Sequence, residues 1–258
     1  RIHRRPKPRH SLLDERRLHY AAWEGCLDQL VARYSRNKYI DIFLLTGPFC
    51  TSRDPYGWTA VHHASFKGHL MLIKFLLQTG QVEVNSQDFF NCTPLHRSCS
   101  GGNPETTDFL LQKGASHSAR SCSGQTPLHL AAASGHLGTA RVLLQHLASP
   151  NPQDFHKWTP LHWAIFGGWG DVAELLLDNG ADVEGGEGVG TSPLQLAVLV
   201  GNEVGVRLLL HRGADANMRG PNGHTAMHLC ACSGDKKVTD YALKVWSGMY
   251  LTAFIKIN

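Results

Sequence analysis

The amino-acid sequence predicts an all-α protein, a solenoid of stacked antiparallel helix pairs with β-turn fingers between the pairs. Three observations support this prediction. A four-residue motif recurs, and its first residue returns at intervals of 34, 33, 33, 33 and 33 residues. An apolar triplet follows each of the first five copies of the motif, and a glycine lies between the motif and the triplet. A repeat of this length indicates units that bury their apolar faces on their neighbours, so we expect six such units across residues 54–245.

The motif marks the start of the first helix in each unit. Thr or Ser is a favoured N-cap residue whose hydroxyl accepts a backbone N–H, and Pro suits the first helical position because its missing donor has no partner there. The copies read TAVH (59–62), TPLH (93–96), TPLH (126–129), TPLH (159–162), SPLQ (192–195) and TAMH (225–228).

The glycines and apolar triplets predict the rest of each unit. A turn is expected at the central glycine, followed by a second helix that carries the triplet and ends at another small residue, often a glycine in the left-handed conformation. The central glycines are Gly68, Gly102, Gly135, Gly168, Gly201 and Gly234. The closing glycines are Gly80, Gly114, Gly180 and Gly213.

The period, the TPLH motif, the central Gly and the Gly-Ala step together resemble the ankyrin-repeat family over roughly residues 50–245. The segment GQTPLHLAAASGHLGTARVLL (124–144) matches the family pattern most fully. Outside the six repeats, residues 1–10 form a basic tail, and residues 11–53 are expected to be a divergent N-terminal capping repeat with an insertion. Residues 246–258 are expected to be a C-terminal cap or a truncated tail.

Composition and charge restrict the classes of function. With 258 residues and 42% hydrophobic residues, the chain has enough apolar material for a core, and its net charge is +4. Residues 1–10 hold five Lys or Arg and no acid, so the rest of the chain is near neutral and nucleic-acid binding is disfavoured. No apolar run reaches the roughly 20 residues of a membrane-spanning helix. Seven scattered cysteines do not suggest a disulfide framework, so we expect a cytoplasmic protein, with a nuclear location as the alternative.

The sequence contains no recognisable catalytic, cofactor-binding or metal-binding motif, and we expect no enzyme activity, cofactor or metal. Five of the 16 histidines lie in the repeated motif, where the family resemblance implies that they brace neighbouring repeats through backbone hydrogen bonds: His62, His96, His129, His162 and His228. Gln195 replaces this histidine once, and its amide can also form hydrogen bonds. The Gly-rich stretch at residues 185–192 lacks the Lys of a phosphate-binding loop and is expected to be a finger with Gly190 at its turn.

The resemblance implies that a protein partner binds on the concave surface formed by the fingers and first helices. Aromatic residues are enriched at binding hot spots, and the register places several of them on this surface. A Trp just before the motif Thr is common in the family, where it can pack on its own unit, so Phe66, Phe89, Phe90 and Phe166 are the stronger candidates. The candidate partner-binding residues are Tyr56, Trp58, Phe66, Phe89, Phe90, Phe155, Trp158 and Phe166.

Asn85 and Asn217 resemble the family's asparaginyl hydroxylation sites, because each has a Leu eight residues before it and an acidic residue two before it. The alternative is an Asn that stabilises its own turn.

We therefore expect a monomeric adaptor or scaffold that binds a protein partner and does not associate with a membrane. The main alternative is a substrate-recognition or targeting module of a larger enzyme or ubiquitin-ligase complex. Nucleic-acid or nucleotide binding is the less favoured alternative.

Overall fold

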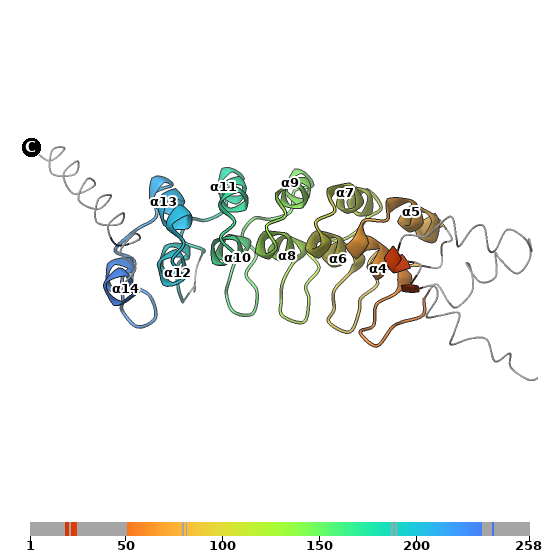
Figure 1. The fold of residues 1–258 in the computed structure, drawn as a ribbon, viewed down its shortest axis with the longest axis horizontal. Helices are drawn as coiled ribbons and strands as arrows, with labels where there is room; N and C mark the ends of the chain where they lie inside the picture. The colour runs from red at the N-terminus through yellow and green to blue at the C-terminus, as the bar shows by residue number, and fades with distance from the viewer. Residues whose placement is uncertain are drawn as a thin grey trace, which may run out of the picture. The chain divides into compact units, whose positions relative to one another are not determined.

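The computed structural model describes residues 19–20, 22–24, 51–78, 80, 82–186, 188, 190–233 and 239. The basic tail, most of the expected N-terminal cap and the segment 246–258 lie outside these residues. The described part of the chain contains helices and turns but no strand, which confirms the all-α repeat architecture (Figure 1). The chain divides into two compact units, Arg1–Cys122 and Ser123–Asn258, called unit 1 and unit 2 below.

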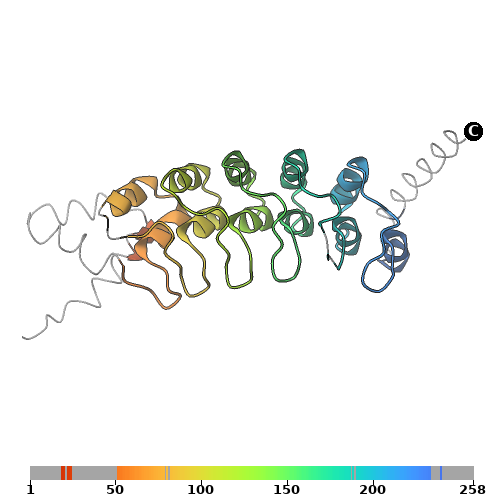
Figure 2. The same cartoon turned by 180° about the vertical axis from the view of Figure 1, so that it is seen from behind.

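Unit 1 contains two described helix pairs. The first pair is α4 (Ala60–Lys67) with α5 (Leu70–Gln78), and the second is α6 (Pro94–Gly101) with α7 (Pro104–Gln112). Helix α4 packs on α6, and α5 packs on α7. The first helices thus form one layer of the unit and the second helices form another, with the finger loops on the far side of the first helices (Figures 1 and 2).

Unit 2 continues the same pattern in three helix pairs and one further first helix. First helices pack on first helices, and second helices on second helices. The helices are α8 (Pro127–Ala133), α9 (Leu137–Gln145), α10 (Pro160–Phe166), α11 (Gly170–Asp178), α12 (Pro193–Leu199), α13 (Glu203–His211) and α14 (Ala226–Ser233). The second helix expected after α14 lies almost wholly outside the described residues.

The repeated motif supplies the core as well as the helix starts. Its apolar third residue is fully buried in five successive repeats, and a leucine of each second helix is buried opposite it. Burial of one such side chain contributes about 1.5–3 kcal/mol to stability. The motif residues are Val61, Leu95, Leu128, Leu161 and Leu194, and their counterparts on the second helices are Leu76, Leu110, Leu143, Leu176 and Leu209.

The helix starts follow the expected N-cap pattern with one difference. Ser192 has an extended backbone, and its hydroxyl accepts a hydrogen bond from the backbone N–H of Gln195, as predicted. At Thr59, Thr93, Thr126 and Thr159 the backbone is also extended and the same capping box forms, but the hydroxyl bonds in addition to the ring of the motif histidine. The cap is therefore made by two side chains.

The finger at residues 185–192 differs from the sequence-based expectation. In the other fingers a left-handed residue lies two positions before the motif, at Gly57, Asn91, Gly124, Lys157 and Gly223. Gly190 does not take this conformation, whereas Gly185, Gly186 and Gly188 do.

The end of the second helix reveals an exception in the third repeat. The expected glycines Gly114, Gly180 and Gly213 all have positive φ, and in the third repeat Leu147 takes the same conformation with φ of 61°. A left-handed conformation is unfavourable for a residue with a Cβ, by roughly 1–2 kcal/mol. Leu147 is also 86% exposed, so its side chain regains little by packing.

We predict that Leu147→Gly raises the free energy of unfolding by about 1 kcal/mol, because it removes this backbone strain. Urea unfolding followed by circular dichroism measures the change. Gly180→Leu is the matched control: a Cβ at Gly180 would meet no atom within 4 Å, so it should lower stability by a similar amount through φ alone. Equal or lower stability of Leu147→Gly would contradict the prediction.

Candidate partner-binding surface

The motif histidines connect each first helix to the following finger. In unit 1, Nδ1 of His62 lies 3.2 Å from the backbone N of Thr59 and 2.9 Å from its hydroxyl oxygen. A backbone N–H can only donate, so Nδ1 is an acceptor and the hydrogen of the neutral ring is on Nε2. Nε2 then donates to the carbonyl oxygen of Cys92 at 3.2 Å. One imidazole therefore caps its own helix and holds the next repeat.

The same brace recurs within unit 2. Nε2 of His129 donates to the carbonyl of Trp158 at 3.0 Å, and Nε2 of His162 donates to that of Thr191 at 3.1 Å. Gln195 performs the task with an amide: Oε1 accepts from the N–H of Ser192, and Nε2 donates to two carbonyls, those of Met218 and His224. These contacts confirm the brace and the expected hydrogen bonding of Gln195.

Burial keeps two of these histidines neutral. It lowers the pKa of His62 to about 4, against weaker opposing effects of Asp88 and of the hydrogen bond to Cys92. Burial likewise lowers the pKa of His162 to about 4. A proton on either ring would put a hydrogen on Nδ1, which could then no longer accept the backbone N–H of the threonine.

Three aspartates form a second link, which the sequence reasoning missed. In unit 1, Oδ1 of Asp54 accepts the N–H groups of Tyr56 and Trp58 at 2.9 and 2.8 Å, and Oδ2 accepts Nε2–H of His63 at 3.0 Å. One oxygen thus closes the finger turn, while the other joins the finger to the first helix.

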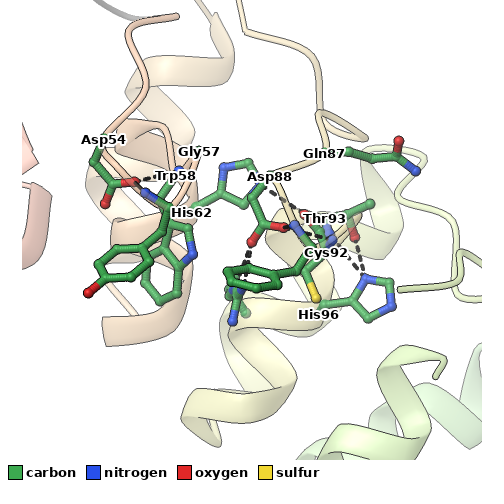
Figure 3. A network of polar contacts seen from close by, with 12 residues as sticks. Asp54, Gly57, Trp58, His62, Gln87, Asp88, Cys92, Thr93 and His96 are labelled. Carbon is green, nitrogen blue, oxygen red and sulfur yellow. Dashed lines mark hydrogen bonds and ion pairs between the residues drawn. The ribbon is translucent and has the colours of Figure 1, made fainter. Parts of the chain in front are cut away.

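The next finger of unit 1 repeats this link (Figure 3). Oδ1 of Asp88 accepts the N–H groups of Phe90 and Cys92 at 2.8 and 2.9 Å, and Oδ2 pairs with the Arg97 guanidinium. The Asp88 side chain is inaccessible to solvent, so this ion pair is largely shielded. In unit 2, Asp154 closes its turn through His156 N and Trp158 N and accepts Trp163 Nε1–H at 3.0 Å.

The three links share one signal in the sequence, an Asp nine residues before the side chain that it binds. We call them the aspartate locks. The partner at the ninth position is His, Arg or Trp, so a search for one fixed residue pair does not find the pattern.

In unit 1 the candidate aromatic residues divide into exposed finger tips and half-buried inner rings. Tyr56 and Phe89 are 63% and 64% exposed, and Phe90 is 47% exposed. Phe66 is half-buried, because it stacks on Trp23 with ring centroids 5.7 Å apart and also meets Trp58 at 5.8 Å.

Phe89 is exposed and at the same time packs on the preceding finger. A Cβ on Gly57 would come within 2.7 Å of the Phe89 ring, and the Phe89 N–H donates to the Tyr56 carbonyl at 3.2 Å. In unit 2 the Phe155 ring covers Gly124 in the same way. Both tips are therefore held in place from one side.

In unit 2 three aromatic residues, Trp158, Trp163 and Phe166, form a strip of rings in contact. Trp158 meets Trp163 at 5.0 Å and Phe166 at 5.6 Å between ring centroids, and Trp163 meets Phe166 at 6.2 Å. Phe155 is 70% exposed at the finger tip, and Phe166 is 52% exposed at the end of α10. The strip therefore runs from the finger to the end of the first helix. The role of the candidate residues in binding a partner stays a prediction.

The two candidate hydroxylation sites have different surroundings. Asn85 does not stabilise its own turn: Nδ2 donates to the Gly114 carbonyl at 3.1 Å, and Oδ1 accepts the Ser116 N–H at 2.9 Å, both in the following repeat. The Asn217 N–H donates to Asp215 Oδ1 at 2.8 Å. Hydroxylation of Asn85 and Asn217 stays a prediction.

Neither a metal-binding cluster nor a membrane-spanning helix is found among the described residues. They contain no group of three or more His, Cys, Asp or Glu side chains arranged to hold a metal ion. None of their helices has the length and apolar character needed to cross a membrane.

The lowered pKa values of His62 and His162 predict that acid destabilises the protein. The unfolded chain binds protons below about pH 6.5 and the folded rings only near pH 4, so stability is complete above pH 6.5 and is lost as the pH falls toward 4. At about pH 5 each ring is expected to cost on the order of 2 kcal/mol relative to about pH 7. Urea unfolding at the two pH values measures the loss.

A double variant, His62→Gln and His162→Gln, isolates the contribution of these rings, because Gln195 shows that an amide fits the same place. The loss of stability between the two pH values should be clearly smaller in this variant, since all other titrating groups are unchanged. An unchanged loss would show that the acid sensitivity arises elsewhere.

Comparison with protein families agrees with the repeat architecture. The model described as ankyrin repeats (3 copies) matches residues 18–121 and 116–186, and the model described as ankyrin repeat matches residues 189–221. The first match begins in the segment expected to be the N-terminal cap.

Similar curated proteins include two mammalian regulatory subunits. The chain is 30% identical over 101 residues to protein phosphatase 1 regulatory subunit 27 of Homo sapiens and 34% identical over 101 residues to that of Mus musculus. Each match covers 39% of this chain and 59% of the relative, so it spans less than two thirds of the relative's length. A palmitoyltransferase of Eremothecium gossypii is 37% identical over 65 residues, which are 25% of this chain and 9% of that protein. Because the family models match most of its length, the chain belongs to the ankyrin-repeat family.

Proposed function

We propose that this protein is a non-catalytic adaptor that binds a protein partner through its fingers and first helices. The observation that carries the proposal is a set of exposed aromatic side chains, on the fingers at Tyr56, Phe89, Phe90 and Phe155 and at the end of helix α10 at Phe166. Ankyrin repeats are protein-interaction modules, and the similarity to phosphatase regulatory subunits supports a role in binding over a role in catalysis.

The aspartate locks make this surface suitable for tight binding. Association is costly when loops and side chains must first be ordered, by about 0.5–1.5 kcal/mol for each immobilised flexible side chain. Here the turns are already closed by Asp54, Asp88 and Asp154, and the rings of Phe89 and Phe155 each lie against a glycine of the preceding finger. Little ordering is therefore left to occur on binding.

A second candidate is a regulatory or targeting module that brings an enzyme to its substrate. The matches to the two protein phosphatase 1 regulatory subunits favour it specifically. It uses the same binding surface and differs in the partner, which would be the catalytic subunit of a phosphatase or another enzyme.

We predict that two pairs of substitutions abolish partner capture while the protein stays folded: Phe89→Ala with Phe90→Ala, and Phe155→Ala with Phe166→Ala. Truncation of a binding hot spot costs about 2 kcal/mol or more of binding free energy, whereas these exposed rings contribute little to the core. Affinity capture with mass spectrometry, using the intact chain and both variants, identifies the partners that are lost. A phosphatase catalytic subunit among them favours the second candidate.

Two controls accompany this experiment. Met71→Ala removes a similarly exposed apolar side chain from α5, outside the fingers and first helices, and should retain the partners. Leu128→Ala, in the core of α8, should instead lower the free energy of unfolding by about 2–5 kcal/mol. Partners that are kept by the Phe variants and lost with Met71→Ala would refute the assigned surface.

A further inference from the structure

The first helices and fingers of unit 1 present a surface with an uneven charge distribution. We call it the unit 1 face: the solvent-accessible side chains of residues 53–58 and 87–92 and of helices α4 and α6. Its cations include Arg53 and Lys67, both exposed, and Arg97, which is partly exposed. Neither α4 nor α6 contains an Asp or Glu.

The carboxylates of the unit 1 face are directed into the protein. Asp54 and Asp88 are the two acidic residues of its finger segments, and both are engaged in aspartate locks with their side chains 15% and 0% exposed. The exposed carboxylates among the described residues of unit 1 belong to other segments, namely Glu24, Glu83 and Glu105. The accessible charge of the unit 1 face is therefore positive.

Contacts with aromatic rings fix two of these cations. Lys67 Nζ lies 3.8 Å from the centroid of the Trp23 ring, Trp23 stacks on Phe66, and Phe66 meets Trp58. The Arg97 guanidinium lies 4.3 Å from the centroid of the Trp58 ring and completes the series. The charge of Arg97 is compensated by Asp88, whereas a cation over an aromatic ring keeps its full charge, so Lys67 displays positive charge beside apolar surface.

Arg53 is fixed in a different way. Its Nη1 donates to the carbonyl oxygens of Gln87 at 2.5 Å and Gly57 at 3.1 Å, so the guanidinium bridges the two fingers and its charge is not cancelled by a carboxylate there. The exposed tips Tyr56, Phe89 and Phe90 belong to the same two fingers. Positive charge and accessible apolar area thus lie together on these two fingers.

From this pattern we propose that the unit 1 face binds a protein segment that carries carboxylates next to apolar side chains. The inference rests on the proposed function and adds the chemistry of the partner. Positive potential steers an acidic segment to the face and penalises a basic one, since like charges brought together cost free energy. The aromatic tips supply the apolar contacts that give the segment its affinity.

A single-stranded nucleic acid also carries negative charge and apolar rings, but it fits the unit 1 face less well. Such a ligand gains most of its sequence-tolerant affinity by stacking bases on open aromatic faces. The rings of Trp23, Phe66 and Trp58 instead contact one another, and the first and last of them also contact Lys67 and Arg97.

The test is a selection of displayed random peptides on the full chain, followed by fluorescence anisotropy with the selected peptides. The expected result is enrichment of Asp and Glu beside aromatic or aliphatic residues. Lys67→Glu should weaken the binding of such a peptide by about tenfold, Lys67→Met by less, and added salt should weaken it further. Replacing the peptide's Asp and Glu with Asn and Gln should have a similar effect.

Lys113→Glu provides the matched control. Lys113 is an exposed lysine of the same unit that lies 5.6 Å from the centroid of an aromatic ring, Phe109, but it caps α7 outside the unit 1 face. The charge change is the same, so binding should stay within about twofold of the unsubstituted chain if the local charge of the face is responsible.

The outcomes separate this inference from the proposed function. The inference is overturned if the selected peptides lack an acidic bias, or if their affinity for the Lys67→Glu variant equals their affinity for the unsubstituted chain. Even then, loss of their binding in the Phe89→Ala, Phe90→Ala variant would support the adaptor function. Tighter binding of an oligothymidine probe than of the selected peptides also overturns the inference. Failure to select any peptide counts against the inference. If, in addition, the Phe substitutions do not affect partner capture, the proposed adaptor function is contradicted as well.

Discussion

The imidazole of the repeated motif is the interaction on which the rest of the structure depends. It joins three things that must stay together in a repeat stack: the cap of a first helix, the base of that repeat's finger and the backbone of the next repeat. His62 shows this most fully, with bonds to Thr59 and to Cys92 from a single buried ring. Each helix is only about two turns long, and such short helices are marginal alone. Links between repeats therefore have to supply the order that the helices lack.

The choice of a histidine for this task carries a chemical constraint. The ring must be neutral to accept at Nδ1, and burial enforces this by opposing the charged form. Gln195 satisfies the same geometry with an amide, which has no proton to gain. The fifth repeat thus keeps the mechanical link without the dependence on protonation.

The sequence predicted the helix positions well because the determinants are local and repeated. A cap residue, a Pro, a buried Leu and a turn Gly each act within a few residues, so reading them in register located every first helix from α4 to α14. It predicted the shape of individual fingers less well. Gly190 does not form the turn expected of it, and at the end of the second helix of the third repeat Leu147 occupies a position where the register favours glycine.

For the candidate surface, the register identified the aromatic finger tips but not how exposed each one is. Phe66 and Phe166 occupy equivalent places in their repeats, yet Phe66 is half-buried because Trp23, far away in the sequence, stacks on it. Contacts of this kind join distant segments, and no local pattern encodes them.

The aspartate locks were missed for a different reason, since only one of the two linked residues is constant. One oxygen always binds the finger backbone, while the other binds a histidine in the first repeat, an arginine in the second and a tryptophan in the fourth. The residue nine positions after the Asp can therefore change from aromatic to cationic while the Asp keeps the finger turn closed. A single substitution at that position would thus change the charge and shape of the side chain beside one finger without requiring a new loop.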